Sequence, residues 1–87
     1  MTNRSRDYNR QVLRELLKAL RKERAGLTQV ELSKALGRPQ SYVSKYETGE
    51  RRLDYVEVAE ICQAIGVPVG EFNEAYQAHM KTGGKKV

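Results

Sequence analysis

The sequence predicts an all-α protein of five short helices in one domain. Apolar residues recur three and four positions apart along most of the chain, which is the spacing of one buried helix face. Residues that start and end helices separate these segments, and the alternating patterns typical of strands are weak throughout. The chain has 87 residues, of which 39% are hydrophobic, so it is long enough for one helical core and too short for two.

The first helix is predicted to begin at Tyr8, capped by Asp7, and to end at Ala25 and Gly26. Its apolar stripe comprises Tyr8, Val12, Leu13, Leu16, Leu17 and Leu20. Its basic residues occupy other faces, at Arg10, Arg14, Lys18 and Arg21. Residues 1–7 lack apolar periodicity and are predicted to form a flexible basic arm.

The second and third helices are predicted to follow one another closely. Thr28 and Glu31 fit a capping box, and Gly37 suits the end of the second helix. The buried side of that helix comprises Leu32, Ala35 and Leu36. Pro39 fits the first position of the third helix, where no amide donor is needed, so this helix is predicted over residues 39–48 and stops at Gly49.

Two more helices complete the predicted domain, which covers residues 8–79. Asp54 and Glu57 make a second capping box, and Gly66 closes the fourth helix. The apolar residues of that helix are Val56, Ala59, Ile61, Cys62 and Ile65. A fifth helix of about ten residues carries Phe72, which we assign to the core, and Tyr76, which fits a core or a dimer contact equally. Residues 80–87 are predicted to be a flexible basic tail.

The turn between the second and third helices is too short for an antiparallel hairpin. A small residue, a glycine and two apolar anchors follow in the order that a helix-turn-helix requires, at Ser33, Gly37, Val43 and Tyr46. In this motif the second helix can lie in the DNA major groove. We expect positions 39, 43 and 46 to dock on the domain and to leave a polar face outside, at Gln40, Ser41, Ser44, Lys45 and Thr48. Taken alone, such a face favours a merely solvated helix, as most polar helix faces are.

The distribution of charge favours an acidic partner for the first half of the chain. The formal net charge is +5. Residues 1–52 hold 13 Lys and Arg against 6 Asp and Glu, whereas residues 53–87 hold 3 against 5. Together with the turn spacing, this basic half indicates that the polar face of the third helix meets DNA.

Several other classes of protein are not supported by the sequence. The single cysteine, Cys62, lies in an apolar pattern, where a small buried hydrophobe is expected, and the single histidine, His79, has no metal-binding companions. We therefore predict no enzyme activity, no cofactor and no metal site. The chain shows no membrane-spanning run or signal-peptide pattern, so a cytoplasmic location is expected.

Three segments resemble a known family. They are Leu27–Gly37 (LTQVELSKALG), Gln40–Gly49 (QSYVSKYETG) and Ala64–Val67 (AIGV). They are similar to the lambda-repressor/Cro family, the helix-turn-helix regulators of the xenobiotic-response-element type, over about residues 13–76. The resemblance implies a five-helix lambda-repressor-like fold that binds double-stranded DNA, usually as a dimer.

The resemblance also implies roles for individual residues. Base reading falls to Gln40, Ser41, Ser44 and Lys45. The residues expected to contact the DNA backbone are Gln29, Tyr42, Thr48, Arg51 and Arg52. Arg4 and Arg6 would add contacts from a basic arm, unless the amino terminus is simply disordered. Gln29 would also brace Gln40. Lys22 and Glu47 match positions that the family often joins as an ion pair, although two unrelated surface charges fit the sequence equally.

This sequence departs from the family pattern at two positions. Ser33 stands where alanine is usual, so its hydroxyl needs a hydrogen-bond partner. Pro39 stands where a Ser or Thr cap is common, which puts the exact pose of Gln40 in doubt.

The function expected from these observations is sequence-specific binding of double-stranded DNA by a homodimeric transcriptional regulator, most simply a repressor. The alternative is an antitoxin-like or adaptor protein whose main partner is another polypeptide, such as a toxin. A preferred DNA sequence would distinguish the first function from the second.

Overall fold

The computed structural model describes the backbone of residues 2–86 and the side chains of residues 6–80. This part of the chain folds into five α-helices and one short π-helical segment, and it contains no strand. The elements are α1 (Thr2–Leu20), η1 (Arg21–Ala25), α2 (Gln29–Ala35), α3 (Tyr42–Glu47), α4 (Tyr55–Ile65) and α5 (Val69–Lys86). The predicted all-α class with five helices is confirmed.

Local signals in the sequence set the ends of the inner helices. The Thr28 hydroxyl accepts a hydrogen bond from the Glu31 N–H at 3.0 Å, and the Glu31 carboxylate accepts one from the Thr28 N–H at 2.9 Å. Asp54 and Glu57 form the same reciprocal pair at the start of α4. Both predicted capping boxes are therefore present, and each satisfies backbone donors that the first helical turn leaves open.

The two outer helices are longer than predicted. α1 begins at Thr2 instead of Tyr8, and α5 continues to Lys86 instead of ending near residue 79. Residues 2–7 and 80–86, which we predicted to be flexible ends, are thus helical in backbone. Each residue added to an existing helix gains a hydrogen bond without a new nucleus, so a helix can extend past its apolar pattern. Met1 and Val87 lie outside the described residues.

The core is formed where the helices meet. Leu17 of α1, Leu32 of α2, Val43 of α3 and Ile61 of α4 are all fully buried. Cys62 is a buried free thiol, as predicted, and burial raises its pKa to about 11, so it stays protonated and acts as a small apolar residue.

Four apolar positions differ from the predicted pattern. Ala35, which we placed on the buried side of the second helix, is exposed. Tyr8 is 41% exposed and Val56 is 63% exposed, although both were placed on apolar stripes. Val58 takes the buried position in α4 instead. Phe72 lies in the core, as predicted, and the half-buried Tyr76 ring stacks on it with 6.5 Å between ring centroids.

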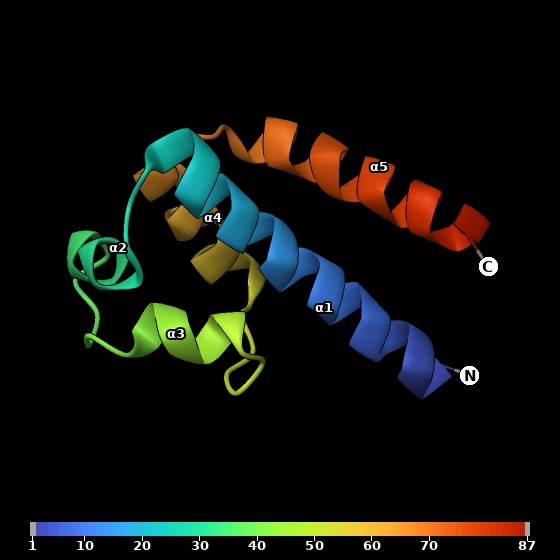
Figure 1. Ribbon diagram of the computed structural model, residues 1–87, viewed down its shortest axis with the longest axis horizontal. Helices are drawn as coiled ribbons and strands as arrows, with labels where there is room; N and C mark the ends of the chain where they lie inside the picture. Colours follow the sequence, from blue (N-terminus) through green and yellow to red (C-terminus); the bar gives the residue numbers. More distant parts are fainter. Residues whose placement is uncertain (1, 87) are drawn as a thin grey trace.

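α2 and α3 lie together at one end of the molecule, whereas the amino end of α1 and the carboxyl end of α5 point to the other end (Figure 1). α1 packs against both α3 and α5, and α2 packs against both α3 and α4. No helix in the described part of the chain is long and apolar enough to cross a membrane. The arrangement leaves one side of α3 uncovered by the other helices.

Candidate nucleic-acid interface

α3 begins at Tyr42, three residues later than predicted, because Pro39 starts a tight turn instead of a regular helical turn. The Tyr42 N–H donates to the Pro39 carbonyl at 2.9 Å, a bond that spans only three residues. Pro39 itself is exposed and does not dock on the domain, contrary to our prediction. Gln40 and Ser41 therefore lie in the turn that leads into α3.

The missing cap of α3 is supplied by another helix. The Ser33 hydroxyl, on fully buried Ser33 of α2, accepts a hydrogen bond from the Val43 N–H at 3.1 Å. Ser41, at the capping position, makes no side-chain cap bond. The two departures from the family pattern thus compensate each other, since the Ser33 hydroxyl satisfies a backbone donor of α3 that Pro39 cannot satisfy.

Replacing Ser33 with alanine is expected to lower the free energy of unfolding by about 1–3 kcal/mol, because the buried Val43 N–H would lose its acceptor. Urea denaturation followed by circular dichroism measures the change. Ser41→Ala is the matched control, since this exposed hydroxyl caps nothing, and its effect should stay within about 0.5 kcal/mol. Equal stabilities of the two variants would contradict this role for Ser33.

The uncovered side of α3 and the turn before it carries the four residues that we predicted to read bases. We call Gln40, Ser41, Ser44 and Lys45 the reading face. Ser44 is half-buried and the other three are exposed. Within the described chain, none of the four uses its side chain in a hydrogen bond or an ion pair. Their donors and acceptors are therefore available to a partner.

Tyr42 lies in the core, whereas the sequence indicated a position that flanks the reading face. Its side chain is only 5% exposed and packs edge-on against Tyr46. The guanidinium groups of Arg38 and Arg51 lie over the Tyr42 ring, at 5.1 and 5.0 Å from its centroid. These cation–π contacts anchor the start of α3 to the loops on both sides of it.

Glu47, at the end of α3, forms an ion pair with Arg21 and not with Lys22. The predicted ion pair is therefore wrong in its cation, which is the residue before Lys22. The Arg21 Nε lies 2.8 Å from the Glu47 Oε2, and the two side chains are 7% and 2% exposed. Arg21 also donates to the Leu27 carbonyl at 2.7 Å. Lys22 is exposed and forms no ion pair in the described chain.

The shift by one position has a local cause. Arg21–Ala25 form a π-helical turn, which holds about one more residue than an α-helical turn and therefore rotates the residues before it. The turn ends at Gly26, whose φ of 64° lies in the left-handed region. The resemblance to the family had implied Lys22, the next residue along the chain.

Gln29 binds Glu47 and does not brace Gln40 as we expected. Its Nε2 donates to the Glu47 Oε1 at 2.8 Å. Glu47 thus accepts from Gln29 and, through two bonds of 2.8 and 3.1 Å, from Arg21. This buried network joins η1, the start of α2 and the end of α3, so it fixes the angle at which α3 leaves the domain.

The residues predicted to touch the DNA backbone differ in their availability. The Arg51 Nη2 lies 2.8 Å from the Glu57 Oε2, and the Arg51 guanidinium lowers the pKa of the Glu57 carboxyl. Arg52 is exposed and forms no ion pair with any described residue. Thr48 is exposed, and its hydroxyl donates to the Lys45 carbonyl. Arg6 is exposed on α1, whereas the side chain of Arg4 lies outside the described residues.

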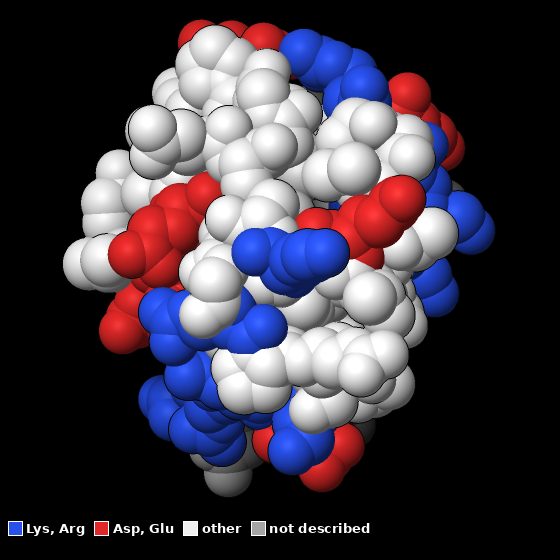
Figure 2. All heavy atoms as spheres, turned by 90° about the vertical axis from the view of Figure 1, so that its left-hand side faces the viewer, with Lys and Arg blue, Asp and Glu red and all other residues white. Residues whose placement is uncertain are grey.

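The face that contains α2 and α3 carries an uneven charge. Figure 2 shows that Lys and Arg side chains form their largest group in the lower half of this face, which is the level of α3 in Figure 1. The sequence located the basic charge in residues 1–52 but not on one face. A basic surface beside an uncovered polar helix is typical of nucleic-acid binding.

Comparisons with known proteins agree with this geometry. Residues 12–75 match a family described as "Helix-turn-helix domain". A solved structure described as "XRE-family like protein", from Pseudomonas syringae pv. tomato str. DC3000, is similar with a TM-score of 0.83 and 41% sequence identity, over 90% of this chain and 94% of that one. No curated protein matches the chain significantly in sequence. By sequence and by fold, the chain belongs to the XRE-type, lambda-repressor-like family of helix-turn-helix proteins, whose members are DNA-binding regulators of transcription.

Proposed function

We propose that this chain binds a preferred sequence of double-stranded DNA as a homodimer and represses transcription there. The observation that carries the proposal is the reading face, whose polar side chains lie on the uncovered side of α3 and in the turn before it and have no partner in the described chain. A surface of this kind suits the edges of base pairs, which offer hydrogen-bond donors and acceptors in the major groove.

The side chains of the reading face match the chemistry of particular bases. A glutamine such as Gln40 can form two hydrogen bonds with adenine, and a lysine such as Lys45 can donate to the guanine acceptors. Ser41 and Ser44 can bond to several base edges. Each of these contacts depends on the angle of α3, which the Ser33 bond and the Glu47 network hold in place.

Contacts with phosphates would set the register of the protein on the duplex. In this proposal they come from Gln29 at the start of α2, Thr48 at the end of α3, and Arg51 and Arg52 in the loop that follows. Arg6, which is exposed on α1, would add a further phosphate contact. Two copies would read half-sites about 10 base pairs apart on one side of the duplex.

Replacing Lys45 with alanine is expected to weaken binding to the preferred operator by about 1–3 kcal/mol and to relax the choice of base at one position, because a base contact is lost. The same holds for Gln40→Ala at a different position. Fluorescence anisotropy with operators that differ at single base pairs measures both effects. Unchanged base preferences in both variants would count against the reading face.

Replacing Arg52 with alanine is expected to weaken binding to all DNA sequences alike, because a phosphate contact carries no base information. The dependence of the logarithm of affinity on the logarithm of salt concentration should become shallower by about one. A changed base preference in Arg52→Ala would contradict this division between reading and positioning residues.

Selection of binding sites from random duplex DNA tests the proposed function directly. We expect one symmetric sequence that survives a rise in salt, whereas binding to random duplexes falls steeply. Sedimentation of the complex then gives the number of chains for each site, with two expected. If no sequence is selected, the alternative function as a partner of another polypeptide, such as a toxin, takes its place.

A further inference from the structure

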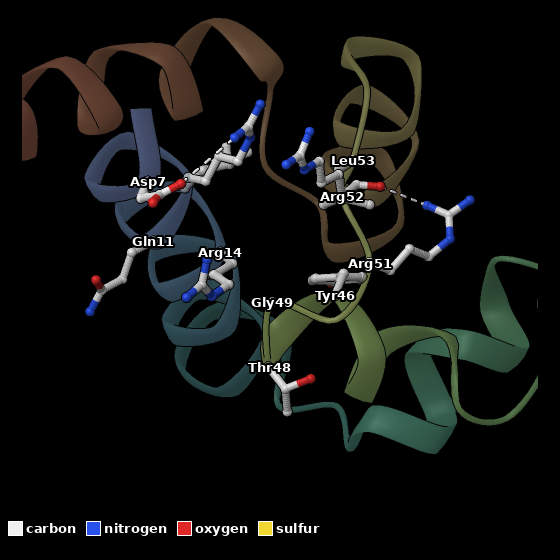
Figure 3. Close-up of a pocket in the computed structure, with 11 residues that line it drawn as sticks. Asp7, Gln11, Arg14, Tyr46, Thr48, Gly49, Arg51, Arg52 and Leu53 are labelled. Carbon is white, nitrogen blue, oxygen red and sulfur yellow. Dashed lines mark hydrogen bonds and ion pairs between the residues drawn. The ribbon is translucent and has the colours of Figure 1, made fainter. Parts of the chain in front are cut away.

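A pocket of about 320 Å³ lies between the first half of α1 and the loop that joins α3 to α4 (Figure 3). Its charged lining consists of one carboxylate, from Asp7, and four guanidinium groups, from Arg10, Arg14, Arg51 and Arg52. The sequence placed Arg10 and Arg14 on the polar faces of the first helix without a function. The fold brings them to the basic loop that ends the helix-turn-helix.

Two of the four arginines are free of internal ion pairs. Arg10 forms an ion pair with Asp7, with 4.0 Å between the Arg10 Nη1 and the Asp7 Oδ1, and Arg51 forms one with Glu57. Arg14 and Arg52 pair with no acidic group among the described residues. The pocket therefore holds a surplus of positive charge, and an anion is the complementary ligand.

Gly49 allows Arg14 to reach the loop. The backbone of Gly49 has a φ of 87°, and a Cβ added there would lie 3.1 Å from Arg14 Cζ and 3.3 Å from its Nη2. Any larger residue would be strained at this φ and would push the guanidinium away. The Arg14 group thus lies against bare backbone at Gly49, just after the end of α3 (Figure 3).

A second feature of this pocket is that the buried side chain of Tyr46 forms part of its lining. Tyr46 lines the pocket, is 1% exposed, and its hydroxyl oxygen has no hydrogen-bond partner among the described residues. Burial raises the pKa of this hydroxyl well above its ordinary value, so it remains a donor. A buried hydroxyl without a partner is costly.

We propose that this pocket binds a phosphate group, with the guanidinium groups of Arg14 and Arg52 as its main donors. Planar guanidinium groups bind phosphate oxygens through paired hydrogen bonds. The inference rests on the proposed function for its expected source, which is a backbone phosphate of the DNA bound by α3. A free phosphate compound shares the chemistry and is distinguished by the test.

The first measurement is the salt dependence of binding to the selected operator, using the full chain. Arg14→Gln is expected to make the slope shallower by about one and to leave the base preferences unchanged, since one phosphate contact is lost. Lys34→Gln is the matched control, because it removes one positive charge from an exposed α2 residue outside the pocket. Its slope should equal that of the unchanged protein.

The second measurement is a titration with inorganic phosphate in the absence of DNA, followed by the NMR amide signals of Thr48 and Gly49. We expect saturable shifts in the unchanged protein and in Lys34→Gln, and reduced shifts in Arg14→Gln and Arg52→Gln. Thermal unfolding by circular dichroism confirms that each variant is folded. If either Arg14→Gln or Arg52→Gln does not fold, the other variant still tests the pocket.

The outcomes separate the source of the phosphate from the existence of the site. Saturable shifts with an altered DNA slope support a backbone phosphate, and saturable shifts with an unaltered slope support a free phosphate compound. No saturable shift together with an unaltered slope overturns the pocket proposal, even if the operator is still bound. A failure of the proposed function is distinct, because the unchanged protein would then select no DNA sequence at all.

Discussion

Replacing Glu47 with alanine is expected to lower the free energy of unfolding by about 3–5 kcal/mol, the largest loss among the polar residues, because Arg21 would keep a buried charge without a partner. The Arg21 side chain is 7% exposed, so water cannot replace the lost carboxylate. Gln29 would lose its acceptor as well. Domains of this size are stabilised by about 5–15 kcal/mol in total, so this change removes a large part of the stability.

Thermal and urea denaturation of the variant, followed by circular dichroism, measure the loss. Lys22→Gln is the control at the position that the sequence indicated, and we expect a change within about 0.5 kcal/mol there because Lys22 is exposed. The double variant Arg21→Met with Glu47→Met should lose less than Glu47→Ala alone, since no buried charge is left unpaired. Equal losses for Lys22→Gln and Glu47→Ala would show that the pairing is wrong.

Replacing Phe72 with alanine is expected to cost about 3–5 kcal/mol of unfolding free energy, through lost burial and the cavity that remains. Phe72 is 4% exposed within a single chain, where it packs into the core and against Tyr76. The loss should therefore be the same at every protein concentration. A contact made only between two chains would instead give a loss that grows as the concentration rises.

Denaturation of the Phe72 variant at several protein concentrations tests this expectation. Tyr55→Ala is the control, because this aromatic side chain is 72% exposed and its removal should change the stability by about 0.5 kcal/mol or less. If the loss of unfolding free energy in Phe72→Ala depends on protein concentration, Phe72 forms a contact between two chains and is not a core residue of one chain.

The inner helix ends were predictable because their causes are local. Thr28 with Glu31 and Asp54 with Glu57 satisfy backbone donors within four residues, so the short segment contains all the partners. The exposure of two residues of the reading face was predictable for a similar reason, whereas their role in base reading stays a prediction. Gln40 and Lys45 follow from the turn spacing and from the resemblance, and the structure leaves both exposed.

The errors arose where a partner comes from elsewhere in the chain. The resemblance to the family implied Lys22, but Arg21, in the π-helical turn, pairs with Glu47, 26 residues away. Tyr42 looked like a surface residue until the two arginines that cover its ring were placed by their own loops. The hydrogen-bond partner of Ser33 was required by its burial, but its identity, the Val43 N–H, was not predictable.

By itself the sequence determined the helical class, the capped starts of α2 and α4, the turn between α2 and α3, and the identity of the polar residues that α3 presents. These depend on hydrogen bonds and periodicities that close within a few residues. Only the tertiary structure decided which cation neutralises Glu47, what caps α3, and that Arg14 of α1 lies against Gly49. Such contacts depend on the packing of helices far apart in the chain, and a change of one residue in a single turn is enough to exchange one partner for its neighbour.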